Sequence, residues 1–489
     1  MIKFGEWLPD QPALQSTGAT EAKNVIPALS GYRQFNSLAA VSGAATNDIL
    51  AMFAGKDDDG NHAIYVGDSA KLYKFNAADS ALTDKSKAGG YSTASTDTWN
   101  FAQFGETLIA TNFTDVIQVA TVAGSAVFAD LSGSPPKAKF LAVVRDQVMT
   151  GYTNDSDGVK PYRLRWSAIN DHTGWTSGTS LSDYQDIPDV GDCTGLVGGE
   201  YAVALFEKAI VRGVFVGAPL VFNFQKVTSA LGCSVPGSVV SAGSARIFFL
   251  SDDGFYMLRG NELASIGAEK VNRFFFDRFQ VNFKQNMVAE IDPLHQTVVW
   301  AYPSIDSADG SNDELLIYNY ALDRWSRAVV DCDALANLST AGYTLEQLDN
   351  ISASIETLPS SLDDAMWKGG TFFFAGAVDK KVASFTGTVL DATLETGEFV
   401  TAPGQRSIVN AVLPYIEHDD SVSPTISVAV GSRLRQIDQP TFATATTQTS
   451  DGYCPARSHG QFHRIRMSIS GEFNVAQGVD VDSKQLGVR

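Results

Sequence analysis

Short segments of alternating polar and apolar residues, closed by turn residues, recur along most of this chain. Residues 63–66, 71–75, 116–119 and 246–250 are examples, and each is rich in β-branched and aromatic side chains. Because side chains alternate between the two faces of a β-strand, this pattern predicts strands rather than helices. The turns between them recur at steps of 47, 42, 51, 45 and 41 residues, near Asp68, Asp115, Asp157, Lys208, Asp253 and Leu294.

A repeat of forty-odd residues is typical of one four-stranded blade of a β-propeller. The composition agrees, because 42 glycines and 29 phenylalanines suit many short strands joined by tight turns. We therefore predict an all-β chain whose main body is a β-propeller of about six to seven four-stranded blades. A set of separate β-sandwiches is the alternative, since no fixed Trp-Asp or Kelch motif returns with the repeat. One helix is predicted over 268–279, where apolar residues recur at steps of three and four.

Three regions follow from this repeat. Residues 1–47 hold three prolines around a polar middle, which predicts an N-terminal extended arm. Residues 48–400 form the predicted propeller, with a loop or short-helix insertion near 337–361. Residues 401–489 alternate again and predict a C-terminal β-rich domain. We expect the two flanking regions to supply assembly contacts, because extended segments bind by adding a strand to a neighbour's sheet. Deleting residues 1–30 should then leave a folded propeller.

The charge of the chain limits the partners that it can hold. Its 36 Lys and Arg residues stand against 55 Asp and Glu, so the formal net charge is −19. A protein that grips nucleic acid needs clustered cations, and this balance disfavours that class. No apolar segment approaches the roughly 20 residues that cross a bilayer. Glu6 and Pro9 stand where a signal peptide would be apolar, and the four cysteines are too scattered for a disulfide scaffold.

The sequence lacks the common catalytic motifs. It has no nucleophile elbow, Walker loop, His-Glu-x-x-His or dinucleotide-binding glycine motif. Cys454, His459 and His463 carry donors that suit zinc, but a structural zinc site needs four ligands. His463 also shares a strand face with Ile465 and Met467, which favours a buried structural histidine. We therefore predict no catalytic, cofactor-binding or metal-binding residues, no cofactor, and a protein that is not an enzyme.

Two further patterns have structural explanations that we favour. The acid-rich stretches 57–61, 155–158 and 306–313 lack the twelve-residue calcium loop and lie where hairpin turns are expected. The stretch 167–176 resembles the Asp-box hairpin of sialidase propellers. No pair of carboxylates stands out for glycoside hydrolysis, however. We expect Asp171 to organise this turn, with Trp166 and Trp175 packed beside it.

Short segments spread over most of the chain resemble one viral protein family. They are residues 5–10 (GEWLPD), 24–27 (NVIP), 31–33 (GYR), 165–168 (RWSA) with Asp171 and Trp175, 205–208 (LFEK), 216–219 (VGAP), 231–233 (LGC), 236–239 (PGSV), 253–256 (DGFY), 266–267 (IG), 272–276 (NRFFF), 318–320 (YNY) and 324–326 (RWS). As a set, they are similar to the tail hub or nozzle proteins of short-tailed bacteriophages (podoviruses), also called packaged-DNA stabilisation proteins. That family offers no catalytic residues to carry over.

The resemblance implies a structural virion protein of the phage tail. Its relatives are similar to β-propellers with added domains and form a ring of six below the head–tail adaptor. The ring retains the packaged double-stranded DNA and serves as its exit channel during ejection. The implied partners are other copies of the chain, the adaptor protein, tail fibres or tailspikes, and DNA that passes through the lumen without specific binding. Synthesis and assembly would take place in the host cytoplasm.

The net charge fits this reading, because an acidic wall repels DNA phosphates and lets a duplex slide. The same charge also serves solubility alone. A carbohydrate-active or receptor-binding propeller of the tail is the alternative function. It would need a funnel of convergent acids and aromatic residues on one propeller face. A cellular scaffold propeller is a third possibility, which the two non-repeating flanking regions disfavour.

Overall fold

The computed structural model describes residues 1–14, 16–243, 246–339, 372–401 and 404–487, together with eight isolated positions between 340 and 371. Strands dominate this structure, and the predicted all-β class is confirmed. The predicted helix is present as α1 (Asn272–Arg278), which is shorter than the expected 268–279. The expected insertion at 337–361 lies mostly outside the described residues, and its first three residues belong to a strand instead.

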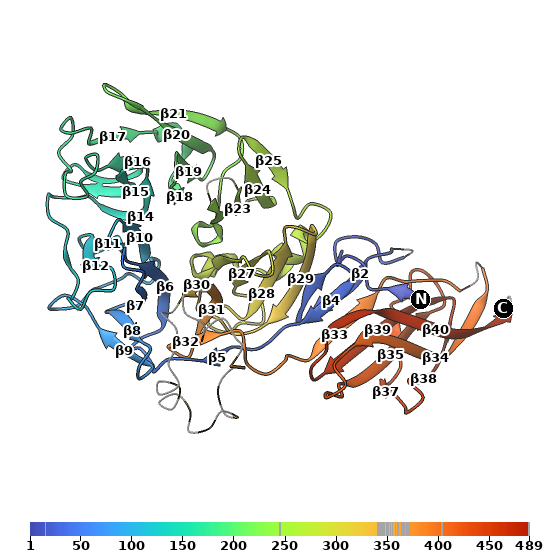
Figure 1. The fold of residues 1–489 in the computed structure, drawn as a ribbon. Helices are drawn as coiled ribbons and strands as arrows, with labels where there is room; N and C mark the ends of the chain where they lie inside the picture. The colour runs from blue at the N-terminus through green and yellow to red at the C-terminus, as the bar shows by residue number, and fades with distance from the viewer. Residues whose placement is uncertain are drawn as a thin grey trace.

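Seven four-stranded antiparallel units surround a common centre in the described part of the chain, so the predicted β-propeller is confirmed (Figure 1). The first six blades follow the chain in order. They are β6 (Ile49–Lys56), β7 (His62–Asp68), β8 (Leu72–Asn76), β9 (Ala81–Asp84); β10 (Asn100–Phe104), β11 (Thr107–Thr111), β12 (Gln118–Thr121), β13 (Ala129–Asp130); β14 (Lys137–Val144), β15 (Gln147–Asp155), β16 (Gly158–Trp166), β17 (Asp183–Asp186); β18 (Cys193–Val197), β19 (Ala202–Phe206), β20 (Ile210–Gly217), β21 (Val221–Thr228); β22 (Val240–Ala242), β23 (Arg246–Ser251), β24 (Gly254–Arg259), β25 (Glu262–Ser265); and β26 (Val288–Asp292), β27 (Thr297–Tyr302), β28 (Glu314–Asn319), β29 (Arg324–Val329).

The seventh blade closes the ring with a strand from the other end of the chain. Its inner strands are β30 (Ala334–Ser339), β31 (Phe372–Val378) and β32 (Lys381–Ser384), and its outermost strand is β5 (Ala39–Ala40). Ala39 and Ala40 lie opposite Ser384 and Ala383 in antiparallel register. A closed circle needs such a clasp, because the first and last blades are otherwise joined only by side-chain packing.

Most of the predicted turns occupy the same position within their blades. Five of them join the second strand of a blade to the third: Asp68, Asp115, Asp157, Lys208 and Asp253. Leu294 instead joins the first two strands of the sixth blade, whose second and third strands are connected by the longer loop 303–313. In the seventh blade, Asp379 and Lys380 have φ values of 51° and 64°, as a tight two-residue hairpin requires.

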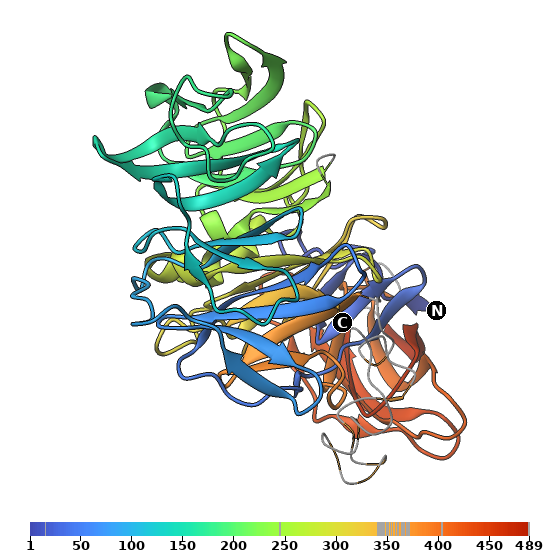
Figure 2. The same cartoon turned by 60° about the vertical axis from the view of Figure 1, so that its left-hand side comes forward.

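The remaining strands form a β-sandwich beside the sixth blade (Figures 1 and 2). One sheet contains β1 (Ile2–Lys3), β3 (Val25–Ala28), β4 (Gly31–Gln34), β40 (Val475–Gly487), β34 (Arg406–Glu417) and β38 (Cys454–Gly460). The other contains β2 (Ala19–Lys23), β33 (Ala392–Thr396), β39 (Phe462–Ser470), β35 (Thr425–Arg433), β36 (Thr441–Phe442) and β37 (Thr446–Thr447). This second sheet continues into the sixth blade, because Lys23 of β2 pairs in parallel with Arg327 of β29.

The structure corrects the expected extended arm at residues 1–47. These residues contribute four strands to the sandwich and a fifth to the seventh blade. The approach is close at Gly31, whose φ is +143° and where a Cβ would lie 2.1 Å from the carbonyl oxygen of Ala476. The prolines suggested an extended arm, but Pro27 lies inside β3, paired with Tyr32 of β4. Deleting residues 1–30 would therefore remove β1 to β3, rather than trim a free segment.

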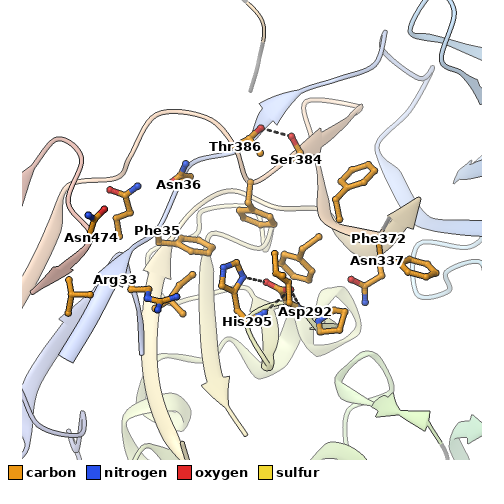
Figure 3. Close-up of a pocket in the computed structure, with 18 of the residues that line it drawn as sticks. Arg33, Phe35, Asn36, Asp292, His295, Asn337, Phe372, Ser384, Thr386 and Asn474 are labelled. Atoms are coloured by element: carbon orange, nitrogen blue, oxygen red, sulfur yellow. Dashed lines mark hydrogen bonds and ion pairs between the residues drawn. The ribbon is translucent and has the colours of Figure 1, made fainter. Parts of the chain in front are cut away.

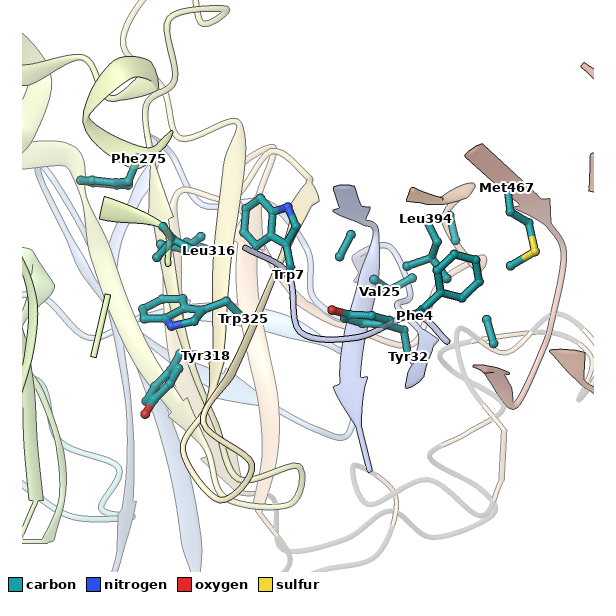
Figure 4. Packing of buried hydrophobic residues seen from close by; sticks show 14 of the residues in the cluster. Phe4, Trp7, Val25, Tyr32, Phe275, Leu316, Tyr318, Trp325, Leu394 and Met467 are labelled. Atoms are coloured by element: carbon teal, nitrogen blue, oxygen red, sulfur yellow. The ribbon is translucent and has the colours of Figure 1, made fainter. Parts of the chain in front are cut away.

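One hydrophobic core spans the sandwich, the N-terminal segment, α1 and the fifth and sixth blades. Figure 4 shows Trp7 between Trp325 and Leu316 of the propeller on one side and Phe4 and Tyr32 on the other. A shared core of this kind fixes two bodies more firmly than a linker does, because any hinge motion would expose apolar surface. We call the contact region around Phe4, Trp7, Tyr32, Leu316 and Trp325 the joint.

Candidate functional site

The joint begins with a helix cap supplied from far away in the sequence. The carboxylate of Asp10 accepts hydrogen bonds from the backbone N–H groups of Arg273 and Phe274, each at 2.8 Å. It thereby satisfies two donors that the start of α1 leaves without partners in the helix. Lys270, two residues before the helix, forms ion pairs with Glu6 at 2.7 Å and with a carboxylate of the sixth blade.

Aromatic side chains fill the space between propeller and sandwich. Trp7 is fully buried, and its ring meets Phe274 edge-on at 4.9 Å between centroids. The hydroxyl of Tyr32 donates to the carbonyl oxygen of Gly5 at 2.8 Å, and the indole N–H of Trp325 donates to a backbone carbonyl at 3.0 Å. Each polar tip is satisfied, so the rings can be buried without an unpaired donor.

A charged network crosses the same region. Arg327 of the sixth blade pairs with Glu21 of β2 at 2.9 Å and with Glu314 of β28. Glu314 is 1% exposed and also accepts from Arg278 at 2.9 Å and from the hydroxyl of Tyr302 at 2.7 Å. Burial and the adjacent Glu314 carboxylate raise the pKa of Tyr302 well above its usual value. Removing either arginine would leave a buried carboxylate with less compensation, which is strongly destabilising.

Five of the thirteen segments behind the phage resemblance meet at this joint. Residues 5–10, 31–33, 272–276, 318–320 and 324–326 all contribute to the contacts or to the core described above. They are scattered over more than 300 residues of sequence. Together they build one connection between propeller and sandwich.

The structure separates the three residues weighed for zinc. Cys454 and His459 lie on β38 in one sheet of the sandwich, whereas His463 lies on β39 in the other. His463 is fully buried, its Nε2 lies 2.7 Å from the hydroxyl of Ser407, and burial lowers its pKa to about 4. It is a neutral core residue, as the strand pattern predicted.

The acid-rich stretches form turns that their own neighbours satisfy. Asp57 accepts from the backbone and the side-chain amide of Asn61, at 2.7 and 2.8 Å. Asp155 and Asp157 pair with the largely buried Arg163, at 3.1 and 3.0 Å. These arrangements agree with the hairpin interpretation and leave the carboxylates engaged within the turn or blade.

The Asp-box-like stretch is also a packed turn. The carboxylate of Asp171 accepts from the backbone and hydroxyl of Thr173, at 2.8 and 2.6 Å. Trp166 and Trp175 are buried, and the ring of Trp166 packs edge-on against Phe222 of the next blade at 5.1 Å. Asp171 therefore organises the turn as predicted, and Trp175 lies beside it, with its indole N–H donating to the carbonyl oxygen of His172 at 2.8 Å, whereas Trp166 packs towards the fourth blade.

The inner strands of the propeller surround a cavity of about 830 Å³. One wall holds a complete ion pair, because Nζ of Lys139 on β14 lies 2.7 Å from Oδ1 of Asp97. The same ammonium lies over the rings of Phe113 and Tyr152, at 5.2 and 4.7 Å from their centroids. Cation–π contacts of this kind stabilise an ammonium group that is partly removed from water.

Acids from three blades lie at one face of the propeller, and three of them, Asp48, Asp309 and Asp333, line this cavity. Asp48 precedes the first strand of the first blade, Asp331 and Asp333 precede the first strand of the seventh, and Asp309 and Asp379 lie in second-to-third-strand connections. In an antiparallel blade these positions lie at the same face of the propeller. We call these five residues the acidic mouth.

Burial and neighbouring acids raise the pKa of two carboxylates of the acidic mouth, whereas hydrogen bonds from Ser311 lower the pKa of Asp309. Burial, followed by Asp48, Asp379, Asp331 and Asp309, raises the pKa of Asp333 to about 6. Burial and neighbouring acids also raise the pKa of Asp331. Like charges within a few ångströms disfavour ionisation in this way. The arrangement therefore stores electrostatic repulsion at one end of the propeller channel.

A second cavity, of about 560 Å³, lies between the last two blades and the sandwich (Figure 3). Its aromatic wall includes Phe35 and Phe385, whose centroids are 5.2 Å apart. The ring of His295 bonds to the buried carboxylate of Asp292 at 2.5 Å, while the hydroxyl of Ser384 bonds to Thr386 well away from it. The pair orients a histidine, and the two labelled hydroxyl residues of this cavity, Ser384 and Thr386, lie away from it, so they form no Ser–His–Asp triad with it.

Neither a metal-binding cluster nor a membrane-spanning helix is present among the described residues. Across residues 1–14, 16–243, 246–339, 372–401 and 404–487, no three His, Cys, Asp or Glu side chains are arranged to hold a metal ion. No helix within these ranges is long and apolar enough to cross a membrane.

The chain is thus a seven-bladed β-propeller joined to a β-sandwich, and comparisons with known proteins add no closer assignment. No family model matches it, and no curated protein matches it. Solved structures similar to it include the computationally designed Ika8 protein and the WD40 domain of Pan2 from Neurospora crassa. Each is 8% identical and has a TM-score of 0.38. Each match covers 72% of this chain, with 99% of the designed protein and 98% of the Pan2 domain. The propeller assignment rests on the sheet order.

Sequence reasoning missed the acidic mouth. Its members are isolated acids in turns, and nothing in their local sequence distinguishes them from other hairpin aspartates. A usable signal exists once the blades are aligned, because Asp48, Asp331 and Asp333 each lie within three residues of the start of an innermost strand. Such positions converge on the axis of a propeller even when they are far apart in sequence.

Proposed function

We propose that this chain is a structural virion protein, a subunit of the tail hub or nozzle of a short-tailed bacteriophage. In this role six copies form a ring below the head–tail adaptor, retain packaged double-stranded DNA and give it an exit channel. The observation that carries the proposal is the joint, because five of the segments that resemble this family converge there: residues 5–10, 31–33, 272–276, 318–320 and 324–326. A fixed connection between two bodies suits a ring subunit, whose neighbours must meet at constant geometry.

The DNA channel of this proposal lies between subunits. The propeller cavity measures about 830 Å³. A cube of that volume has an edge of about 9.4 Å, whereas the major groove of B-DNA alone is roughly 12 Å wide and the duplex that carries it is wider still. A duplex therefore needs a wider passage than one propeller offers. A closed ring with one repeated heterologous contact supplies such a passage.

The net charge of the chain supports a channel wall along which DNA can slide. The net charge of −19 becomes about −114 in a ring of six (6 × −19). Each Lys or Arg contact to phosphate would release counterions and hold the duplex in place, whereas acids keep it moving. Tail fibres or tailspikes and the adaptor would occupy the outer surfaces of the ring.

The test is the assembly state of the purified full-length chain. We expect cryo-electron microscopy and mass photometry to find closed rings of six with an open centre. We also expect labelled duplex DNA to bind hardly at all, even at low salt, where phosphate contacts are strongest. A chain that stays monomeric at every concentration would contradict the ring. Tight and steeply salt-dependent DNA binding would contradict the acidic lumen and leave the ring standing.

A further inference from the structure

The cavity between the last two blades and the sandwich has an aromatic wall (Figure 3). The ring centroid of Phe385 lies 5.2 Å from that of Phe35 and 5.1 Å from that of Phe374, on which it stacks with 19° between the planes. Phe372 and Leu294 line the same cavity and are 54% and 75% exposed. The volume of about 560 Å³ falls within the range of small-molecule sites, roughly 300–1,000 Å³. This lining suits a ligand with an aromatic body.

A guanidinium group without an anionic partner lies at the same cavity. Arg33 is an exposed residue of β4, two positions before Phe35, and both side chains line the cavity (Figure 3). Although the chain holds 55 Asp and Glu, no described residue forms an ion pair or a side-chain hydrogen bond with the guanidinium group of Arg33. Its N–H donors are therefore available, and their planar fork matches the two oxygens of a carboxylate.

The cavity's own acid is already engaged elsewhere. Among the described residues that line the cavity, Asp292 is the single carboxylate. Its Oδ1 accepts hydrogen bonds from the backbone N–H groups of Leu294 and His295, at 2.9 and 3.3 Å, and its Oδ2 lies 2.5 Å from Nδ1 of His295. Asp292 therefore holds its own turn and the imidazole ring, and it leaves the charge of Arg33 to an anion that enters the cavity.

We propose that this cavity binds a small molecule that carries a planar aromatic ring and a carboxylate. The ring packs against Phe35 and Phe385, and the carboxylate accepts two parallel hydrogen bonds from Arg33. Contacts between aromatic rings contribute beyond the area that they bury, and a bidentate charged pair is stronger than a neutral hydrogen bond. A neutral sugar would leave the guanidinium group without a counter-charge. The site lies within one chain, so it does not depend on the phage-tail assignment.

Cinnamate is the probe, and its binding to the full-length chain is measured by calorimetric titration at low salt. We expect saturable binding by the parent chain. Arg33→Gln removes the charge at an exposed position, so it should weaken cinnamate binding about tenfold and leave the melting temperature unchanged. Cinnamamide has the same shape without the charge. We expect it to bind the parent chain and Arg33→Gln within about twofold of each other, because a neutral amide gains little from a guanidinium charge.

Arg457→Gln is the matched control. Arg457 is exposed on β38, three strands from β4 in the same sheet, and it does not line this cavity, so its loss should leave cinnamate binding unchanged. Equal losses in the two variants would reduce the effect to net charge and overturn the proposal. So would a loss of cinnamamide binding in Arg33→Gln as large as that of cinnamate, which would indicate a reshaped cavity. A parent chain that does not bind cinnamate up to its solubility limit, or that binds cyclohexanecarboxylate as tightly, would also contradict it.

Discussion

Glu290 is a carboxyl group without a cationic neighbour, at the wall of the propeller channel. It lies on β26, and its side chain accepts from the backbone of Ile291 at 2.9 Å and from the amide of Asn337 at 3.3 Å. Burial raises its pKa to about 7, because two neutral donors compensate only part of the lost hydration. This carboxyl group is therefore largely protonated in the folded chain under mildly acidic conditions.

The sign of the resulting pH dependence is opposite to that of a salt-bridged acid. The folded chain keeps the Glu290 proton up to about pH 7, whereas the unfolded chain loses it near its ordinary pKa of 4.5. The free energy of unfolding therefore falls as pH rises through this interval, by at most about 3.5 kcal/mol (2.5 units at about 1.4 kcal/mol per unit). Above pH 7 this contribution is constant.

Glu290→Gln should remove that dependence. We expect the variant to gain stability relative to the parent chain as pH rises from 5 to 8, measured by urea unfolding at each pH. Glu106→Gln, an exposed acid in a hairpin turn, is the matched control and should track the parent. Parallel curves for Glu290→Gln and the parent would mean that Glu290 is ionised in the fold, against this prediction.

At the scale of elements, the short strand β5 is the clasp of the propeller ring. Val41, which follows it, is buried, and its backbone N–H donates to the carbonyl oxygen of Val382 at 2.8 Å. The hydroxyl of Ser42 accepts from the N–H of Val382 at 2.9 Å. These bonds continue the pairing of β5 with β32 beyond the two residues of the strand itself.

Val41→Pro should open this clasp. Proline removes the donor and leaves the carbonyl of Val382 unpaired, so we expect a loss of about 1–3 kcal/mol beyond that of Val41→Ala. Val41→Ala is the matched control, since it shortens the side chain and keeps the N–H group. Guanidinium unfolding midpoints at unchanged slope would measure the difference. Equal losses for the two variants would show that the side chain alone matters and that the clasp does not.

The pairing of β5 with β32 is a feature that could not be predicted from the sequence. Hairpin turns were predictable because their chemistry is local: Asp68 accepts from the N–H groups of Ala70 and Lys71, two and three residues away. The pairing of Ala39 with Ser384 joins residues 345 positions apart (384 − 39), and a two-residue alanine strand has no pattern to recognise. The same limit applies to the acidic mouth and to strands β1 and β2, whose partners β40 and β33 lie at the other end of the chain.

For the molecule as a whole, the contacts in the joint determine whether the propeller and the sandwich unfold in a single cooperative transition. The second sheet of the sandwich continues into the sixth blade, Arg327 bridges Glu21 and Glu314, and one core lies under both bodies. Elements that share a sheet and a core lose much of their burial when either one opens. We therefore expect one calorimetric transition with equal calorimetric and van't Hoff enthalpies, although chains of this length often unfold domain by domain.

Trp7→Ala tests this coupling at its centre. The indole of Trp7 is fully buried against α1, and its N–H donates to the carbonyl oxygen of Thr20 at 3.2 Å. Truncation should cost about 3–5 kcal/mol and leave a cavity between the two bodies, so we expect the single transition to separate into two. Trp166→Ala, a buried tryptophan between the third and fourth blades, is the matched control. It should lower the melting temperature and keep one transition, because it leaves the joint intact. Two transitions already present in the parent chain would show that the joint is a contact between independent domains, and the argument from rigidity to ring assembly would lose its support.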